Sequence, residues 1–68
     1  PDMEEELVLS KRLDQLRSQH RLIDQTIDQL SRGAFHDQLQ LVRLKKERLV
    51  LREQIVSIES QLYPDIIA

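Results

Sequence analysis

The chain has 68 residues, no cysteine and a formal net charge of −2 at pH 7. A domain of this length buries only about 60% of the surface of its unfolded chain, and without cysteine neither disulfides nor a thiolate metal site can compensate for a small core. The N-terminus is acidic where a signal peptide would be basic, and the apolar runs are too short to span a bilayer. We therefore expect a cytoplasmic protein outside the membrane whose stability depends on self-association.

A first helix is predicted over residues 3–31. Asp2 can accept hydrogen bonds from the first free backbone N–H groups, and Glu5 is placed three residues later as the other half of a capping box. Apolar residues then recur at alternating spacings of four and three, which is the pattern of a coiled-coil seam. The seam, interrupted only by His20, consists of Leu9, Leu13, Leu16, His20, Ile23, Ile27 and Leu30.

A turn is predicted over residues 32–37. Gly33 suits the left-handed conformation that commonly closes a helix, and Asp37 can cap the next helix. The heptad phase nevertheless continues from Leu30 to Leu41, so one continuous helix in a long coiled coil, or a domain-swapped dimer opened at the turn, is an alternative. Gly33 and the cap at Asp37 favour the closed hairpin.

A second helix is predicted over residues 38–63, ending there because Pro64 disfavours helical geometry in the residue before it. Its seam, interrupted only by Arg48, consists of Leu41, Leu44, Arg48, Leu51, Ile55, Ile58 and Leu62. The predicted fold is all-α: an antiparallel two-helix hairpin of coiled-coil type that assembles into a four-helix homodimer.

The two seams can be paired on paper. A turn centred near residue 34 sets Leu9 opposite Ile58, and it sets His20 opposite Arg48, so that the two polar interruptions share one layer. An imidazole beside a guanidinium calls for an acceptor, and Asp24 lies one helical turn after His20 on the same face. Across the hairpin Asp24 flanks both Arg48 and Lys45.

The sequence therefore predicts a polar layer that fixes the register of the helices, as buried polar residues can. Its members are His20, Asp24, Lys45 and Arg48. A ligand or metal role for His20 with Asp24 is the alternative, but a metal site needs more converging ligands than two, and His36 at the turn is too distant to join.

A second stripe on the second helix lies roughly 150° from its seam, at about 100° per residue. This outer stripe consists of Leu39, Val42, Lys46, Leu49, Glu53 and Val56. Single exposed aliphatic residues are normal on monomers, but their helical spacing, with Phe35 near one end, favours an oligomer interface. A two-fold axis beside Leu49 would set Val42 against Val56, and Lys46 near Glu53, of a second chain.

Catalytic motifs are missing from the sequence, which has no glycine-rich phosphate loop, nucleophile elbow or metal-ligand cluster. We expect no enzyme activity, no cofactor and no metal. A basic cluster could contact nucleic-acid phosphates, and it consists of Arg43, Lys45, Lys46, Arg48 and Arg52. These residues spread around the helix and are diluted by Glu47 and Glu53, so nucleic-acid binding is the weaker interpretation.

Two motifs resemble a known family, one in the first predicted helix and one, made of two segments, in the second. They are the spaced residues His20, Ile23, Asp24 and Ile27, and the segments Arg43-Leu44-Lys45-Lys46-Glu47-Arg48-Leu49 and Leu51-Arg52-Glu53-Gln54-Ile55. Together they look like the core of the YdcH-like family of short bacterial proteins, over roughly residues 13–58. The resemblance implies a bacterial, cytoplasmic helical hairpin of uncharacterised role, and it carries no catalytic residues.

The sequence thus predicts a structural or interaction module, a self-associating hairpin that offers a helical surface to an unidentified protein partner. The alternative is a nucleic-acid-associated accessory protein that uses the basic cluster between Arg43 and Arg52.

Overall fold

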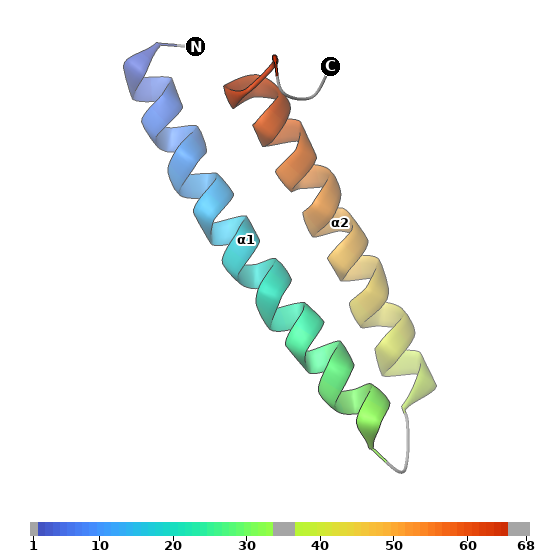
Figure 1. The fold of residues 1–68 in the computed structure, drawn as a ribbon. Coiled ribbons are helices and arrows are strands. Elements are labelled where there is room, and N and C mark those ends of the chain that lie inside the picture. Colours follow the sequence, from blue (N-terminus) through green and yellow to red (C-terminus); the bar gives the residue numbers. More distant parts are fainter. Residues whose placement is uncertain (1, 34–36, 66–68) are drawn as a thin grey trace.

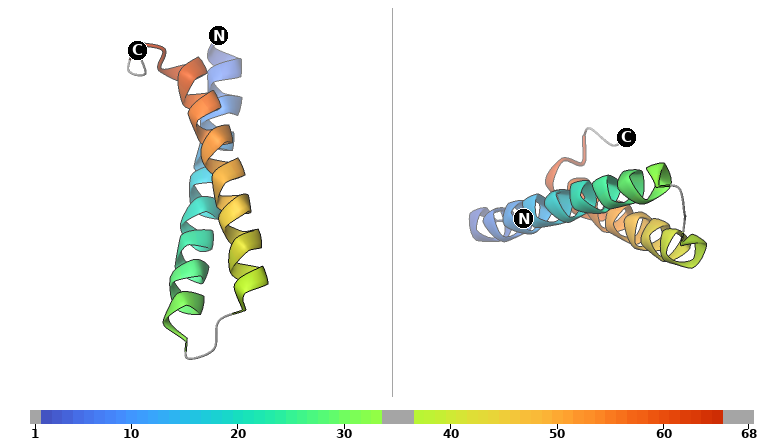
Figure 2. Two further views of the ribbon diagram at one scale, coloured as in Figure 1. Left: turned by 90° about the vertical axis from the view of Figure 1, so that its right-hand side faces the viewer. Right: turned by 90° about the horizontal axis from the view of Figure 1, so that it is seen from below.

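The computed structural model describes residues 2–33 and 37–65 of the chain. They form two helices, α1 (Met3–Arg32) and α2 (Gln38–Leu62), which run antiparallel along a rod with extents of 50 × 22 × 15 Å (Figure 1). The helices are inclined to one another, and the start of α1 and the end of α2 lie at the same end of the rod (Figure 2). The two-helix, all-α hairpin is confirmed for the described residues, and no described helix is long and apolar enough to cross a membrane.

Each helix begins at an aspartate, as predicted. The Asp2 carboxylate accepts a hydrogen bond from the backbone N–H of Glu5 at 2.8 Å, and the Asp37 carboxylate accepts one from Gln40 at 3.0 Å. These bonds satisfy N–H groups that have no partner within the helix. The cap at Asp37 makes α2 a separate helix, so the continuous-helix alternative is wrong for this chain.

The end of α1 differs from the prediction. Gly33 has φ −66° and ψ 155°, an extended conformation open to any residue, and its N–H donates to the carbonyl of Leu30 at 3.4 Å. The predicted left-handed cap is therefore wrong, because the chain leaves the helix directly in an extended direction. The expectations for Phe35 and His36 lie outside the described residues.

The core lies along the line where the two helices meet. All of its buried residues belong to the predicted seams: Leu13, Leu16, Ile27, Leu41 and Ile58. Every other seam position is partly buried, while the described residues off the seams are exposed except for Ser10, Thr26 and Glu59. The periodicity of the sequence therefore identified the inner face of both helices.

The middle of the hairpin lies slightly later in the chain than predicted. Ile58 forms a buried cluster with Leu13 and Leu16, and its predicted partner Leu9 is partly buried and packs against this cluster. The helices end at Arg32 and begin at Gln38, so the midpoint of the hairpin lies near residue 35 instead of 34.

Candidate functional site

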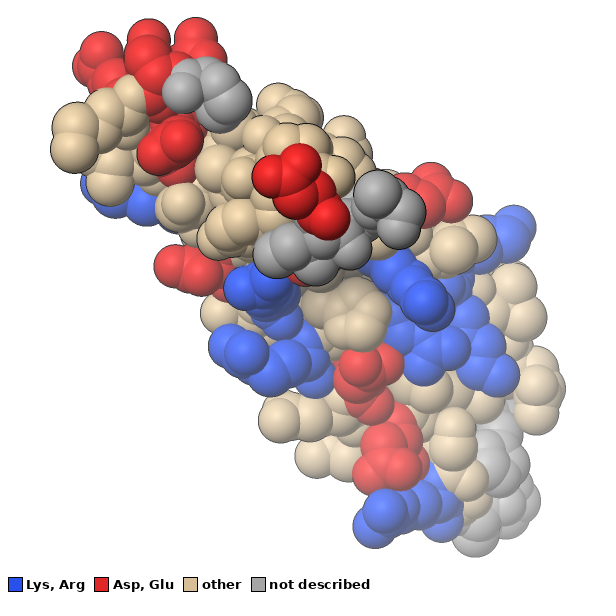
Figure 3. Space-filling model, turned by 45° about the horizontal axis from the view of Figure 1, so that its top comes forward, with Lys and Arg blue, Asp and Glu red and all other residues tan. Residues whose placement is uncertain are grey.

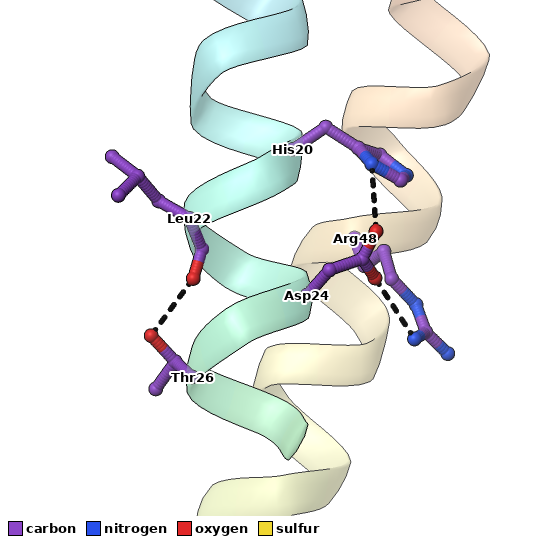
Figure 4. A network of polar contacts seen from close by, with 5 residues as sticks. All are labelled: His20, Leu22, Asp24, Thr26 and Arg48. Atoms are coloured by element: carbon purple, nitrogen blue, oxygen red, sulfur yellow. Dashed lines mark hydrogen bonds and ion pairs between the residues drawn. The ribbon is translucent and has the colours of Figure 1, made fainter. Parts of the chain in front are cut away.

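An aspartate bridges the two helices near the middle of the rod. Asp24 Oδ2 lies 3.2 Å from His20 Nδ1, one turn earlier on α1, and Asp24 Oδ1 accepts a hydrogen bond from Arg48 Nη1 of α2 at 3.2 Å. Figure 4 shows both α1 side chains directed toward α2, whereas Leu22 points to the opposite side. The structure thus brings His20, Asp24 and Arg48 together, with Asp24 between the other two.

The bridge lies at the edge of the interface. The side chains of His20, Asp24 and Arg48 are 26%, 47% and 39% exposed, and no polar or charged residue of the described chain is buried. The predicted polar layer is therefore not a buried layer, since the long Arg48 side chain reaches past the core to the solvent-facing carboxylate. Screening by water limits such a pair to below about 1 kcal/mol.

Lys45, the fourth predicted member, lines the same shallow depression as the bridge, one turn of α2 before Arg48 and Leu49. Among residues 2–33 and 37–65 it forms no ion pair with Asp24, whose oxygens are directed toward His20 and Arg48. The described residues contain no group of three or more His, Cys, Asp or Glu side chains that could hold a metal ion. The bridge is thus a polar link between helices without the donor set of a metal site.

A second link between the helices joins Arg17 and Glu59, whose Nη2 and Oε2 atoms are 3.1 Å apart. Sequence reasoning missed this pair because its members are 42 positions apart and no local spacing connects them. Only the correct register could have indicated it. Together with the bridge at Asp24, the Arg17–Glu59 pair places charged side chains of both helices on one side of the seam.

The outer stripe of α2 is uncovered in the single chain. Leu39, Val42, Leu49 and Val56 are 46–59% exposed, and Lys46 and Glu53 are exposed beside them. Val50, which the sequence reasoning did not include, is 51% exposed and borders a largely apolar depression with Leu22. The uncovered apolar surface of α2 is therefore somewhat wider than the predicted stripe.

The basic cluster is divided between two sides of the hairpin. Lys45, Arg48 and Arg52 line the depression that contains His20, whereas Lys46 lines the one that contains Leu22. Five basic residues close together in the sequence therefore do not form one patch in space.

Comparison with family models gives one match. Residues 13–59, more than half of the chain, match the family described as "Protein of unknown function (DUF465)". The chain belongs to this family. The DUF465 family is the YdcH-like family of small bacterial proteins, so the resemblance drawn from the two motifs is confirmed. Comparisons with curated proteins and with solved structures found no match.

Membership in the DUF465 family places the bridge and the outer stripe within its shared segment. The matched residues begin at the first buried leucine, Leu13, and end at Glu59, which pairs with Arg17. The family segment thus contains all the buried residues of the described chain and both links between the helices. The description of the family assigns no role to any of these residues.

Proposed function

We propose that this DUF465 protein is a non-enzymatic interaction module that pairs with itself through the outer stripe of α2. The dimer then offers the remaining helical surface to a protein partner in the bacterial cytoplasm. The observation that carries the proposal is the exposure of Leu39, Val42, Leu49 and Val56 along one face of a helix whose opposite face is already packed on α1. A helix with apolar residues on two faces is more stable in water when both faces are packed against other elements.

Charge supports an antiparallel pairing of the two α2 helices. A two-fold axis beside Leu49 places Leu49 against Leu49 of the second chain, and Val42 against Val56 of the second chain. Lys46 then lies near Glu53 of the second chain, and the same contact is repeated by symmetry. An isologous interface needs a surface that is complementary to itself, and this stripe has opposite charges in symmetric places.

Sedimentation equilibrium of the wild type and of Leu49→Asp tests the dimer. Two carboxylates beside the axis would be desolvated next to each other, so the variant should be monomeric where the wild type is dimeric. Leu7→Asp is the matched control, because Leu7 is also an exposed leucine, at 60%, but lies near the start of α1 and lines none of the depressions that contain outer-stripe residues. It should leave the dimer intact. A wild type that is monomeric at high micromolar concentration, or a Leu49→Asp chain that dimerises unchanged, would overturn the proposal.

A further inference from the structure

A groove with a surplus of positive charge runs between the helices on the side of His20. Two adjoining depressions form it, and they share His20 and Arg52. Arg17 and Arg21 of α1 line the section nearer the open end of the hairpin. Lys45 and Arg48 of α2 line the section nearer the turn. Leu49 and Val56 of the outer stripe also line the two sections, so the groove borders the proposed dimer interface. Side chains from both helices therefore converge on one continuous groove.

Five cations and two carboxylates, besides His20, line this groove. The carboxylates are Asp24 and Glu59, and each is already directed toward one arginine, Arg48 and Arg17. The remaining three cations, Arg21, Lys45 and Arg52, form no ion pair within the part of the chain that the structure describes; the Arg21 guanidinium donates to the neutral Ser18 hydroxyl at 3.2 Å. The groove therefore has a local excess of positive charge on a chain whose formal net charge is −2.

The paired arginines are also able to bind an anion. A guanidinium group carries five N–H donors, and Arg17 and Arg48 each donate one hydrogen bond to a carboxylate of the other helix. Asp24 and Glu59 thus hold these two arginines in place along the groove while leaving donors free. Planar guanidinium groups and a lysine ammonium are the side chains that proteins use for phosphate oxygens.

We propose that this groove binds a short oligophosphate, a row of three or so phosphate groups such as inorganic tripolyphosphate or the triphosphate of a nucleotide. The groove extends along α1 from Arg17 to Asp24, which is roughly 10 Å at 1.5 Å per residue. That length suits a few phosphates and not a long polymer. Multiple negative charges placed side by side on the ligand match the three uncompensated cations.

Two features favour a short ligand over a nucleic-acid strand. The first turn of α1 carries Glu4, Glu5 and Glu6, so a polyanion continuing along the rod would meet like charges at its open end. Figure 3 shows Lys and Arg side chains gathered around the middle of the rod, with Asp and Glu side chains crowded at the end drawn at the upper left. The groove also lacks an aromatic residue among those that line it, and proteins that bind single strands stack the bases on such residues.

Isothermal titration calorimetry of the full chain with sodium tripolyphosphate tests the proposal. The variant is Arg52→Gln, because Arg52 is shared by both sections, and the matched control is Arg43→Gln, an exposed arginine of α2 that lines neither section. Loss of one charge-assisted contact should weaken binding about tenfold in the first variant and less than about twofold in the second. Lys45→Gln should act like Arg52→Gln, and circular dichroism should show all three variants to be helical.

Two further titrations identify the ligand. Inorganic orthophosphate should bind at least about tenfold more weakly than tripolyphosphate, because it meets fewer of the cations, and added salt should weaken tripolyphosphate binding. If Arg43→Gln and Arg52→Gln weaken tripolyphosphate binding equally, the groove is not the binding site and the attraction is unspecific. A single-stranded oligonucleotide could also bind more tightly than tripolyphosphate, with the same dependence on Arg52. That result would show that the groove binds nucleic acid and not a short oligophosphate. Absence of tripolyphosphate binding by the wild type would overturn the proposal altogether.

Discussion

The two long faces of α2 carry the same kinds of aliphatic side chain and differ in what lies against them. On the inner face Leu41 and Ile58 are 6% and 8% exposed, because α1 covers them. On the outer face Leu49 and Val56 are about half exposed, because no element among residues 2–33 and 37–65 covers them. A two-helix chain can cover only one apolar face of each helix by itself, so the second face of α2 stays uncovered in the single chain.

The largest expected effect belongs to the inner face. Ile58→Ala should lower the free energy of unfolding by about 2 to 5 kcal/mol, since it removes buried methyl groups from the cluster with Leu13 and Leu16. Urea unfolding followed by circular dichroism measures this change. Val56→Ala on the outer face should lower the free energy of unfolding by no more than about 0.5 kcal/mol when the protein is highly diluted. Equal losses in the two variants at high dilution would contradict the difference between the faces.

The contribution of the outer face to thermal stability should depend on protein concentration. Folding coupled to dimerisation makes the midpoint of thermal unfolding rise with concentration, so the wild-type midpoint should rise over a tenfold concentration series. In Leu49→Asp the midpoint should stay constant. A midpoint of the wild type that does not depend on concentration would show that the outer stripe contributes nothing to stability.

A smaller effect is expected from the charges of the outer stripe. Lys46→Glu alone, or Glu53→Lys alone, would set like charges near each other twice in the dimer and should raise its dissociation constant about two- to tenfold. The double variant Lys46→Glu with Glu53→Lys should restore the wild-type constant. Analytical ultracentrifugation of the three variants measures it. Additive losses in the double variant would rule out the antiparallel pairing with its axis beside Leu49.

The smallest effect is expected at the boundary between the two faces, where the bridge lies. Asp24→Ala should lower the free energy of unfolding by less than about 1 kcal/mol, because Arg48 and His20 stay in contact with water when the carboxylate is removed. Urea unfolding measures the loss, with Asp14→Ala, a change of another exposed aspartate of α1, as the control. A loss above about 3 kcal/mol would mean that the bridge is buried in the protein in solution.

Local patterns in the sequence predicted the helices and their inner faces. Asp2 and Asp37 were recognised as caps because an aspartate before a helix has one specific partner, a backbone N–H three residues later. The seams were recognised because apolar spacing alone decides which side of a helix is buried. Asp24 was recognised as an acceptor for Arg48 because it follows His20 by one turn on the face toward the other helix.

The pairing between the helices was decided by the tertiary structure. A seam that repeats every three or four residues offers aliphatic partners in more than one register, so Ile58 can meet Leu9 or Leu13 with little change in apolar contact. The tertiary structure decides between these registers, and with the register it decides the Arg17–Glu59 pair and the exposure of the bridge. Gly33 shows the same limit, since its freedom to adopt a left-handed conformation does not require it to do so, and in the structure it is extended.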